Sequence, residues 1–134
     1  MGSAYTATAV IDVAPELVFA YVRRPENQPR WAVNFVRSTR PLGDGRYTMQ
    51  TPFGELTYRV EADAARGTVD FVIQSDRGES VLPTRVVAAD PLRLASIFTF
   101  TISRTPDMDD PAWEGGKRGL DEELEHLKRL LETA

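Results

Sequence analysis

The last part of the chain carries an apolar stripe that is typical of a helix packed on one side. From Pro111 to Leu131 the apolar residues recur every three or four positions and fall within a narrow arc of a helical wheel. They are Trp113, Gly116, Leu120, Leu124, Leu127 and Leu131. Charged residues such as Glu122 and Lys128 lie outside this arc. A stripe of this length needs an apolar surface to cover it, and the rest of the chain must supply that surface.

Residues 33–103 predict such a surface as a series of short strands. Turn-forming sequences interrupt the region at residues 41–45, 52–54, 64–67, 76–78 and 90–91. Between them apolar and polar residues alternate, which places one apolar set on a common face. That set contains Leu56, Tyr58, Val60, Ala62, Val69, Phe71, Ile73, Phe98, Phe100 and Ile102. The pattern predicts an antiparallel meander with one buried face and one solvated face.

The first part of the chain predicts a strand followed by short helices. Residues 5–13 are rich in Thr, Val and Ile, which favour strands. Pro15 suits the first position of a helix that runs to Arg23. Residues 25–31 then predict a break followed by one further helical turn or an ordered loop.

Composition excludes several classes of function. The 16 basic and 20 acidic residues give a net charge of -4 and are interspersed, so we expect no nucleic-acid binding. The absence of Cys and the presence of a single His exclude disulfides, thiolate sites and imidazole-rich metal sites. No run is apolar and long enough for a membrane span, and the N-terminus lacks the pattern of a secretory signal. We therefore expect one cytoplasmic domain over residues 1–134, with no cofactor and with a homodimer as one candidate assembly.

The order of these elements resembles a known superfamily. The residues that carry the resemblance are Ile11 to Phe19, Pro25 to Trp31, and the closing helix from Gly119 to Leu131. On these residues the chain resembles the START/Bet v 1-like superfamily, in its small bacterial polyketide cyclase/dehydrase-like branch. The resemblance implies an α+β helix-grip fold: a curved antiparallel sheet of about seven strands around the long C-terminal helix, with two short helices after the first strand. It also implies a cavity between sheet and helix, which the large aromatic residues and the glycines of the closing helix would suit.

Candidate ligand-binding residues follow from the apolar faces and from the resemblance. They are Trp31, Tyr58, Phe71, Arg85, Phe98, Phe100, Trp113, Leu120 and Glu123. Glu123 lies at the margin of the helical stripe, where it could present a carboxylate at the rim of a cavity, although a surface glutamate is the favoured alternative. No specific catalytic arrangement is found, and the single His126 lies near the polar face of the helix.

Arg85 belongs to a run in which the alternation does not settle the inward face. If Val81, Pro83 and Val87 face inward, Arg85 does too, and its guanidinium would suit a ligand carboxylate or carbonyl. If Leu82, Thr84, Val86 and Ala88 face inward instead, Arg85 is solvated, and this alternative is favoured. Pro83 predicts an edge or bulged strand.

Three functions remain open, in this order. The first is binding of an apolar or aromatic small molecule, because the predicted lining is apolar and has few ionisable groups. The second is a cyclase, dehydratase or hydrolase-like enzyme acting on such a molecule, which needs at least two polar groups at one point. The third is a co-chaperone-like interaction domain, which predicts an exposed apolar patch.

Overall fold

Seven antiparallel strands form one sheet in the computed structural model, which describes residues 2–134. The strands are β1 (Ala4–Ile11), β2 (Ser38–Pro41), β3 (Arg46–Thr51), β4 (Gly54–Asp63), β5 (Thr68–Ser75), β6 (Gly78–Ala88) and β7 (Ser96–Ser103). Their order in the sheet is β1-β7-β6-β5-β4-β3-β2. Strands β2 to β7 are therefore the predicted meander, and β1 joins the sheet beside β7. This arrangement confirms the helix-grip α+β fold.

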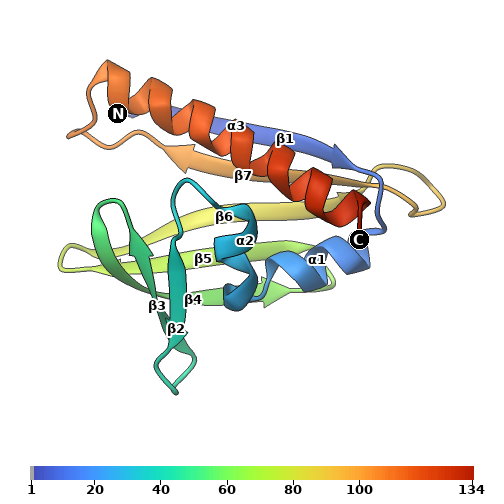
Figure 1. The fold of residues 1–134 in the computed structure, drawn as a ribbon, viewed down its shortest axis with the longest axis horizontal. Helices are drawn as coiled ribbons and strands as arrows, with labels where there is room; N and C mark the ends of the chain where they lie inside the picture. The colour runs from blue at the N-terminus through green and yellow to red at the C-terminus, as the bar shows by residue number, and fades with distance from the viewer. Residues whose placement is uncertain (1) are drawn as a thin grey trace.

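The helices lie where the apolar pattern places them. They are α1 (Pro15–Val22), the 3-10 turn η1 (Pro25–Asn27), α2 (Gln28–Trp31) and α3 (Asp110–Glu132). Pro15 occupies the first turn of α1, where its missing N–H removes no helical hydrogen bond. Helix α3 begins one residue before Pro111, and the Asp109 side chain caps it by accepting a hydrogen bond from the Ala112 N–H at 2.8 Å. Figure 1 shows α3 lying along β1 and β7, with α1 and α2 in front of the middle of the sheet.

The core fills the space between the inner face of the sheet and these helices. Helix α3 buries Leu120, Leu124 and Leu127, as its stripe predicts, and it packs mainly against β1 and α2. The sheet contributes the fully buried rings of Tyr58, Phe71 and Phe98, and α2 contributes that of Trp31. A second group of inner-face side chains is only partly buried against this core. It includes Leu56, Ile73, Leu82 and Ile102, which lie toward the hairpins that join β3 to β4 and β5 to β6.

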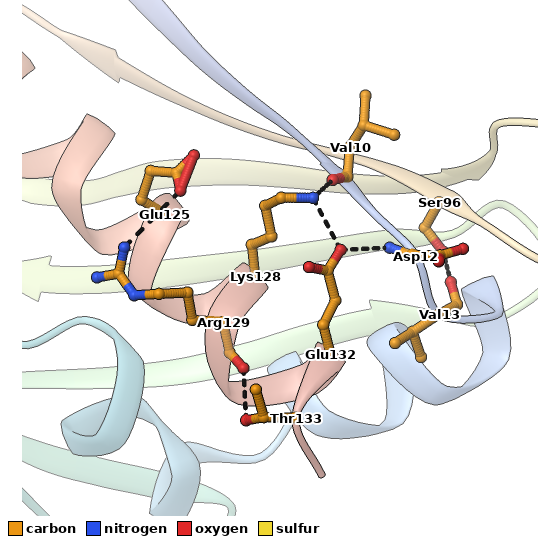
Figure 2. A network of polar contacts seen from close by, with 9 residues as sticks. All are labelled: Val10, Asp12, Val13, Ser96, Glu125, Lys128, Arg129, Glu132 and Thr133. Atoms are coloured by element: carbon orange, nitrogen blue, oxygen red, sulfur yellow. Dashed lines mark hydrogen bonds and ion pairs between the residues drawn. The ribbon is translucent and has the colours of Figure 1, made fainter.

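Polar contacts fasten the C-terminal end of α3 to the end of β1 (Figure 2). Lys128 Nζ donates to the Val10 carbonyl at 2.6 Å and also meets the Glu132 carboxylate at 2.8 Å. The same carboxylate accepts a hydrogen bond from the Asp12 N–H at 2.8 Å. Because the N-terminal strand and the C-terminal helix are tied at this end, α3 is held in place over one half of the sheet.

Strand β6 lies inside the sheet, which corrects part of the expectation drawn from Pro83. It pairs with β5 from Gly78 to Arg85, and its pairing with β7 extends only from Thr84 to Ala88. Pro83 therefore lies just outside the part of β6 that has neighbours on both sides, where a missing N–H is tolerated.

None of the helices among residues 2–134 combines the length and the apolar character that crossing a membrane requires.

Candidate functional site

Aromatic rings from the sheet and from α2 meet at the centre of the interior. The Trp31 ring lies edge-on to Phe98 and Phe100, with centroid separations of 5.9 and 6.2 Å. Phe100 in turn stacks on Phe71 at 6.3 Å. The sheet positions three of these rings by alternation along β5 and β7, whereas Trp31 enters from the last turn of α2. Four of the predicted binding residues are thus brought together.

The indole nitrogen of Trp31 has no hydrogen-bond partner among residues 2–134, although the side chain is fully buried. Among these residues it is the only buried side-chain nitrogen or oxygen without a hydrogen-bond partner. An unpaired buried donor costs about 1–3 kcal/mol relative to a paired one. The donor is therefore open to any acceptor that reaches the aromatic centre.

Tyr58 and Gln28 form a buried polar pair beside the aromatic centre. The Tyr58 hydroxyl donates to Gln28 Oε1 at 2.5 Å, and both side chains are almost inaccessible to solvent. Burial, with the nearby Tyr47 and Glu26, raises the pKa of Tyr58 well above its usual value. The phenol is thus neutral and serves as a donor. Tyr47 covers it from β3, with ring centroids 5.9 Å apart.

Glu123 is a buried carboxylate that holds the connection between α2 and β2. Its Oε2 accepts hydrogen bonds from the backbone N–H groups of Asn34 at 2.9 Å and Phe35 at 3.0 Å. Burial raises the pKa of Glu123 to about 7, although these two hydrogen bonds act in the opposite direction, and the charge of Glu122 adds to the rise. The favoured alternative of a surface glutamate is therefore wrong, because the side chain is buried and contacts the backbone.

Trp113 and Leu120 are both buried on α3, as their positions in the stripe predict. Leu120 belongs to the continuous core, but Trp113 lies outside that cluster. The Trp113 ring instead lies 5.6 Å from the Lys117 ammonium, which also faces the Tyr5 ring. The structure therefore does not bring Trp113 to the aromatic centre.

Arg85 must be corrected as a candidate binding residue. Thr84 and Val86 are buried on the inner face of β6, so Arg85 between them is exposed on the outer face. This is the favoured alternative of the two that the sequence left open. The guanidinium consequently cannot face a ligand between the sheet and α3.

The cavity expected between sheet and helix stays a prediction. Two hollows among residues 2–134 lie at the surface. One, of about 350 Å³, is lined by Gly2, Arg104, Thr105, Pro106 and Met108. The other, of about 400 Å³, is lined by Arg23, Arg24, Pro25, Glu26, Gly45, Tyr47, Val60 and Ala62, and we call it the α1 corner hollow.

Two glycines of α3 lie close to side chains of neighbouring elements. A Cβ placed on Gly119 would lie 3.5 Å from Asn34 Nδ2, and one on Gly116 would lie 4.0 Å from Ile102 Cδ1. The Asn34 amide uses this proximity to donate to the Gly119 carbonyl at 3.0 Å. Both distances are those of ordinary van der Waals contact, so the positions of these glycines do not by themselves indicate an empty space beneath the helix.

Sequence reasoning missed Gln28, Asn34 and Tyr47. Tyr47 could have been found, because it alternates with the buried Met49 along β3. Gln28 begins the four-residue helix α2, and Asn34 lies in the connection that follows it. Both segments are too short for a periodicity to indicate which side chain turns inward.

Comparison with known proteins places this geometry in a family. The profile of the family described as polyketide cyclase / dehydrase and lipid transport matches residues 4–132. A search among curated proteins finds no match.

Solved structures share the fold at low sequence identity. The Aha1 dimer from Colwellia psychrerythraea is 13% identical with a TM-score of 0.74, covering 97% of this chain and 96% of that one. A START superfamily protein from Mycobacterium smegmatis is 15% identical with a TM-score of 0.66, covering 97% and 94%. The di-domain ARO/CYC BexL from the BE-7585A biosynthetic pathway is 18% identical with a TM-score of 0.71, covering 97% of this chain but 46% of that one.

Proposed function

The chain belongs to the polyketide cyclase/dehydrase and lipid transport family, and from this membership we propose that it binds an apolar or aromatic small molecule bearing a hydrogen-bond acceptor. The ligand lies on the inner face of the sheet, beside Trp31, Phe98 and Phe100. The family description supports an apolar ligand, and the side chains of the interior supply the more specific requirement for an acceptor.

The unpaired indole N–H of Trp31 is the observation that carries the proposal. Buried polar groups in native proteins nearly always have a partner, so an orphan donor among aromatic rings indicates a place for one. A carbonyl or ether oxygen of a ligand would pair the donor, while the ligand's rings pack against Phe98 and Phe100. Such a pocket has the usual composition of small-molecule sites, with an apolar lining and few polar groups that fix orientation.

Access to the centre is easiest where helices cover the sheet least. Leu56, Ile73 and Leu82 are apolar inner-face side chains that remain partly exposed near the two hairpins. Because α3 packs mainly on β1 and α2, these side chains can shift without displacing the helix. A ligand that replaces them against the core would also bury their apolar surface.

Catalysis is the second candidate, and Glu123 is the observation that favours it, because a buried carboxyl with a pKa of about 7 is suited to proton transfer. Against it, Glu123 Oε2 already accepts two backbone hydrogen bonds, and the Tyr58 hydroxyl is engaged by Gln28. Binding is therefore the better supported function. If the chain turns over an aromatic polyketide, Glu123→Gln should abolish turnover while leaving binding intact.

A matched pair of probes tests the binding proposal. Acetylnaphthalene carries a carbonyl acceptor, and ethylnaphthalene has a similar shape without one. We expect the wild-type protein to bind acetylnaphthalene at one equivalent and about tenfold more tightly, since one hydrogen bond contributes about 1 kcal/mol or slightly more. Trp31→Phe should bind both probes equally. No saturable binding of either probe to the folded protein would refute the proposal.

A further inference from the structure

The α1 corner hollow has the features of a second ligand site, separate from the aromatic centre. Its lining comes from three distant parts of the chain: the segment that follows α1, the start of β3 and the end of β4. Its volume of about 400 Å³ lies within the range of small-molecule pockets. Trp31, Phe98 and Phe100 do not line it, so the two sites can be tested independently.

The floor of the hollow is an uncovered part of the inner face. Tyr47 and Val60 are half-buried, and Ala62 is exposed where β4 runs past the end of α1. Tyr47 is also held rigidly from below, because its ring packs on Tyr58, which is fixed by its bond to Gln28. A flat apolar group can therefore pack on a preformed aromatic surface.

The rim of the hollow carries an arginine without a carboxylate partner. Arg24 pairs with Glu26 at 2.7 Å, whereas Arg23 takes part in none of the ion pairs formed by residues 2–134. The Arg23 guanidinium lies 5.7 Å from the centroid of the Phe19 ring, which supports the side chain at the edge of the hollow. Two arginines and one glutamate leave this hollow locally positive in a chain whose net charge is -4.

We infer that the α1 corner hollow binds an aromatic carboxylate, whose ring packs on Tyr47 and Val60 and whose acid group pairs with Arg23. The planar fork of a guanidinium matches a carboxylate with two parallel hydrogen bonds, which an ammonium or a hydroxyl cannot do. The negative charge of Glu26 repels the acid group of such a ligand. The ion pair of Glu26 with Arg24 also makes that guanidinium less available to the ligand. Removing that charge should therefore strengthen binding, which is an effect that a merely apolar surface would not show.

Titration with naphthoate, followed by backbone amide shifts and by calorimetry, tests this site. We expect shifts confined to residues 23–26, 45–47 and 60–62, and weaker binding of the neutral analogue naphthylmethanol. Arg23→Gln should weaken naphthoate binding about tenfold, as expected for loss of one charge-assisted contact. Glu26→Gln should strengthen it severalfold. Arg85→Gln, which removes the same charge from the outer face, should change nothing.

Two results would overturn the inference. One is equal naphthoate affinity in the wild type, Arg23→Gln and Glu26→Gln. The other is a titration in which the Trp31 indole responds and the amides of residues 23–26 do not, because the acid would then lie at the aromatic centre. The latter result would leave the proposed function standing. Conversely, failure of the acetylnaphthalene experiment would not affect naphthoate binding at the hollow.

Discussion

The backbone of Asn34 and the side chain of Glu123 join the α2–β2 connection to the C-terminal helix. The Asn34 N–H donates to Glu123 Oε2 at 2.9 Å, and the Asn34 side chain donates to the Gly119 carbonyl one turn earlier on α3. The Glu123 side chain is buried, so its ionisation state affects the stability of the whole domain.

Stability should fall as the pH rises through the range in which Glu123 ionises. Its pKa is about 7 in the folded protein and about 4.5 when unfolded, so between these values the folded state holds a proton that the unfolded state has lost. Stability must then decrease with rising pH, by up to roughly 3 kcal/mol between pH 4.5 and 7. We expect Glu123→Gln to lack this decrease and to exceed the wild type at pH 8.

Urea unfolding of the two proteins between pH 4.5 and 8 measures this difference. Glu125→Gln is the matched control, because Glu125 is an exposed acid on the same helix. Parallel stability curves for Glu123→Gln and the wild type would show that Glu123 ionises normally in the folded state.

Leu124→Asp should unfold the domain or destabilise it by roughly 3 kcal/mol or more, since it places an unpaired charge at a fully buried position of α3. Glu125→Asp introduces the same residue at the adjacent exposed position and should change stability little. Thermal melts of both variants provide the measurement. An unchanged melting temperature for Leu124→Asp would contradict the packing of α3 against the core.

Tyr58 and Gln28 should be coupled energetically. Tyr58→Phe keeps the ring but leaves the buried Gln28 oxygen without its donor, at a cost of about 1–3 kcal/mol. Once Gln28→Leu has removed that oxygen, Tyr58→Phe should cost much less. A double-mutant cycle by urea unfolding measures the coupling. Additive losses would mean that the hydroxyl and the amide do not interact.

The fold could be predicted from sequence because two periodicities agree. The alternation in β4, β5 and β7 indicates one buried face, and the stripe from Trp113 to Leu131 indicates the helix that covers it. The agreement fails at Arg85, because both faces of β6 are partly apolar. There the neighbouring strands decide the orientation, through the register that sets Thr84 opposite Val69 and Phe100.

The site was less predictable because its contacts are formed across elements. Trp31 and Tyr58 could be identified as interior residues, but the pairing of Tyr58 with Gln28 depends on how α2 docks. Glu123 could be placed near the edge of the stripe, yet its partners are backbone N–H groups that no side-chain pattern reveals. The predicted cavity stays a prediction for a related reason, since glycines in α3 can serve close packing as well as open space.

The indole N–H signals of Trp31 and Trp113 test the central claim most directly. In protein labelled with ¹⁵N-tryptophan, Trp31→Phe assigns the two signals by removing one of them. On titration with acetylnaphthalene, we predict that the Trp31 signal moves downfield as its N–H gains an acceptor, while the Trp113 signal, outside the core cluster, stays in place. Ethylnaphthalene should not produce the downfield shift. A Trp31 signal that stays unchanged at saturating acetylnaphthalene would contradict ligand binding at the aromatic centre.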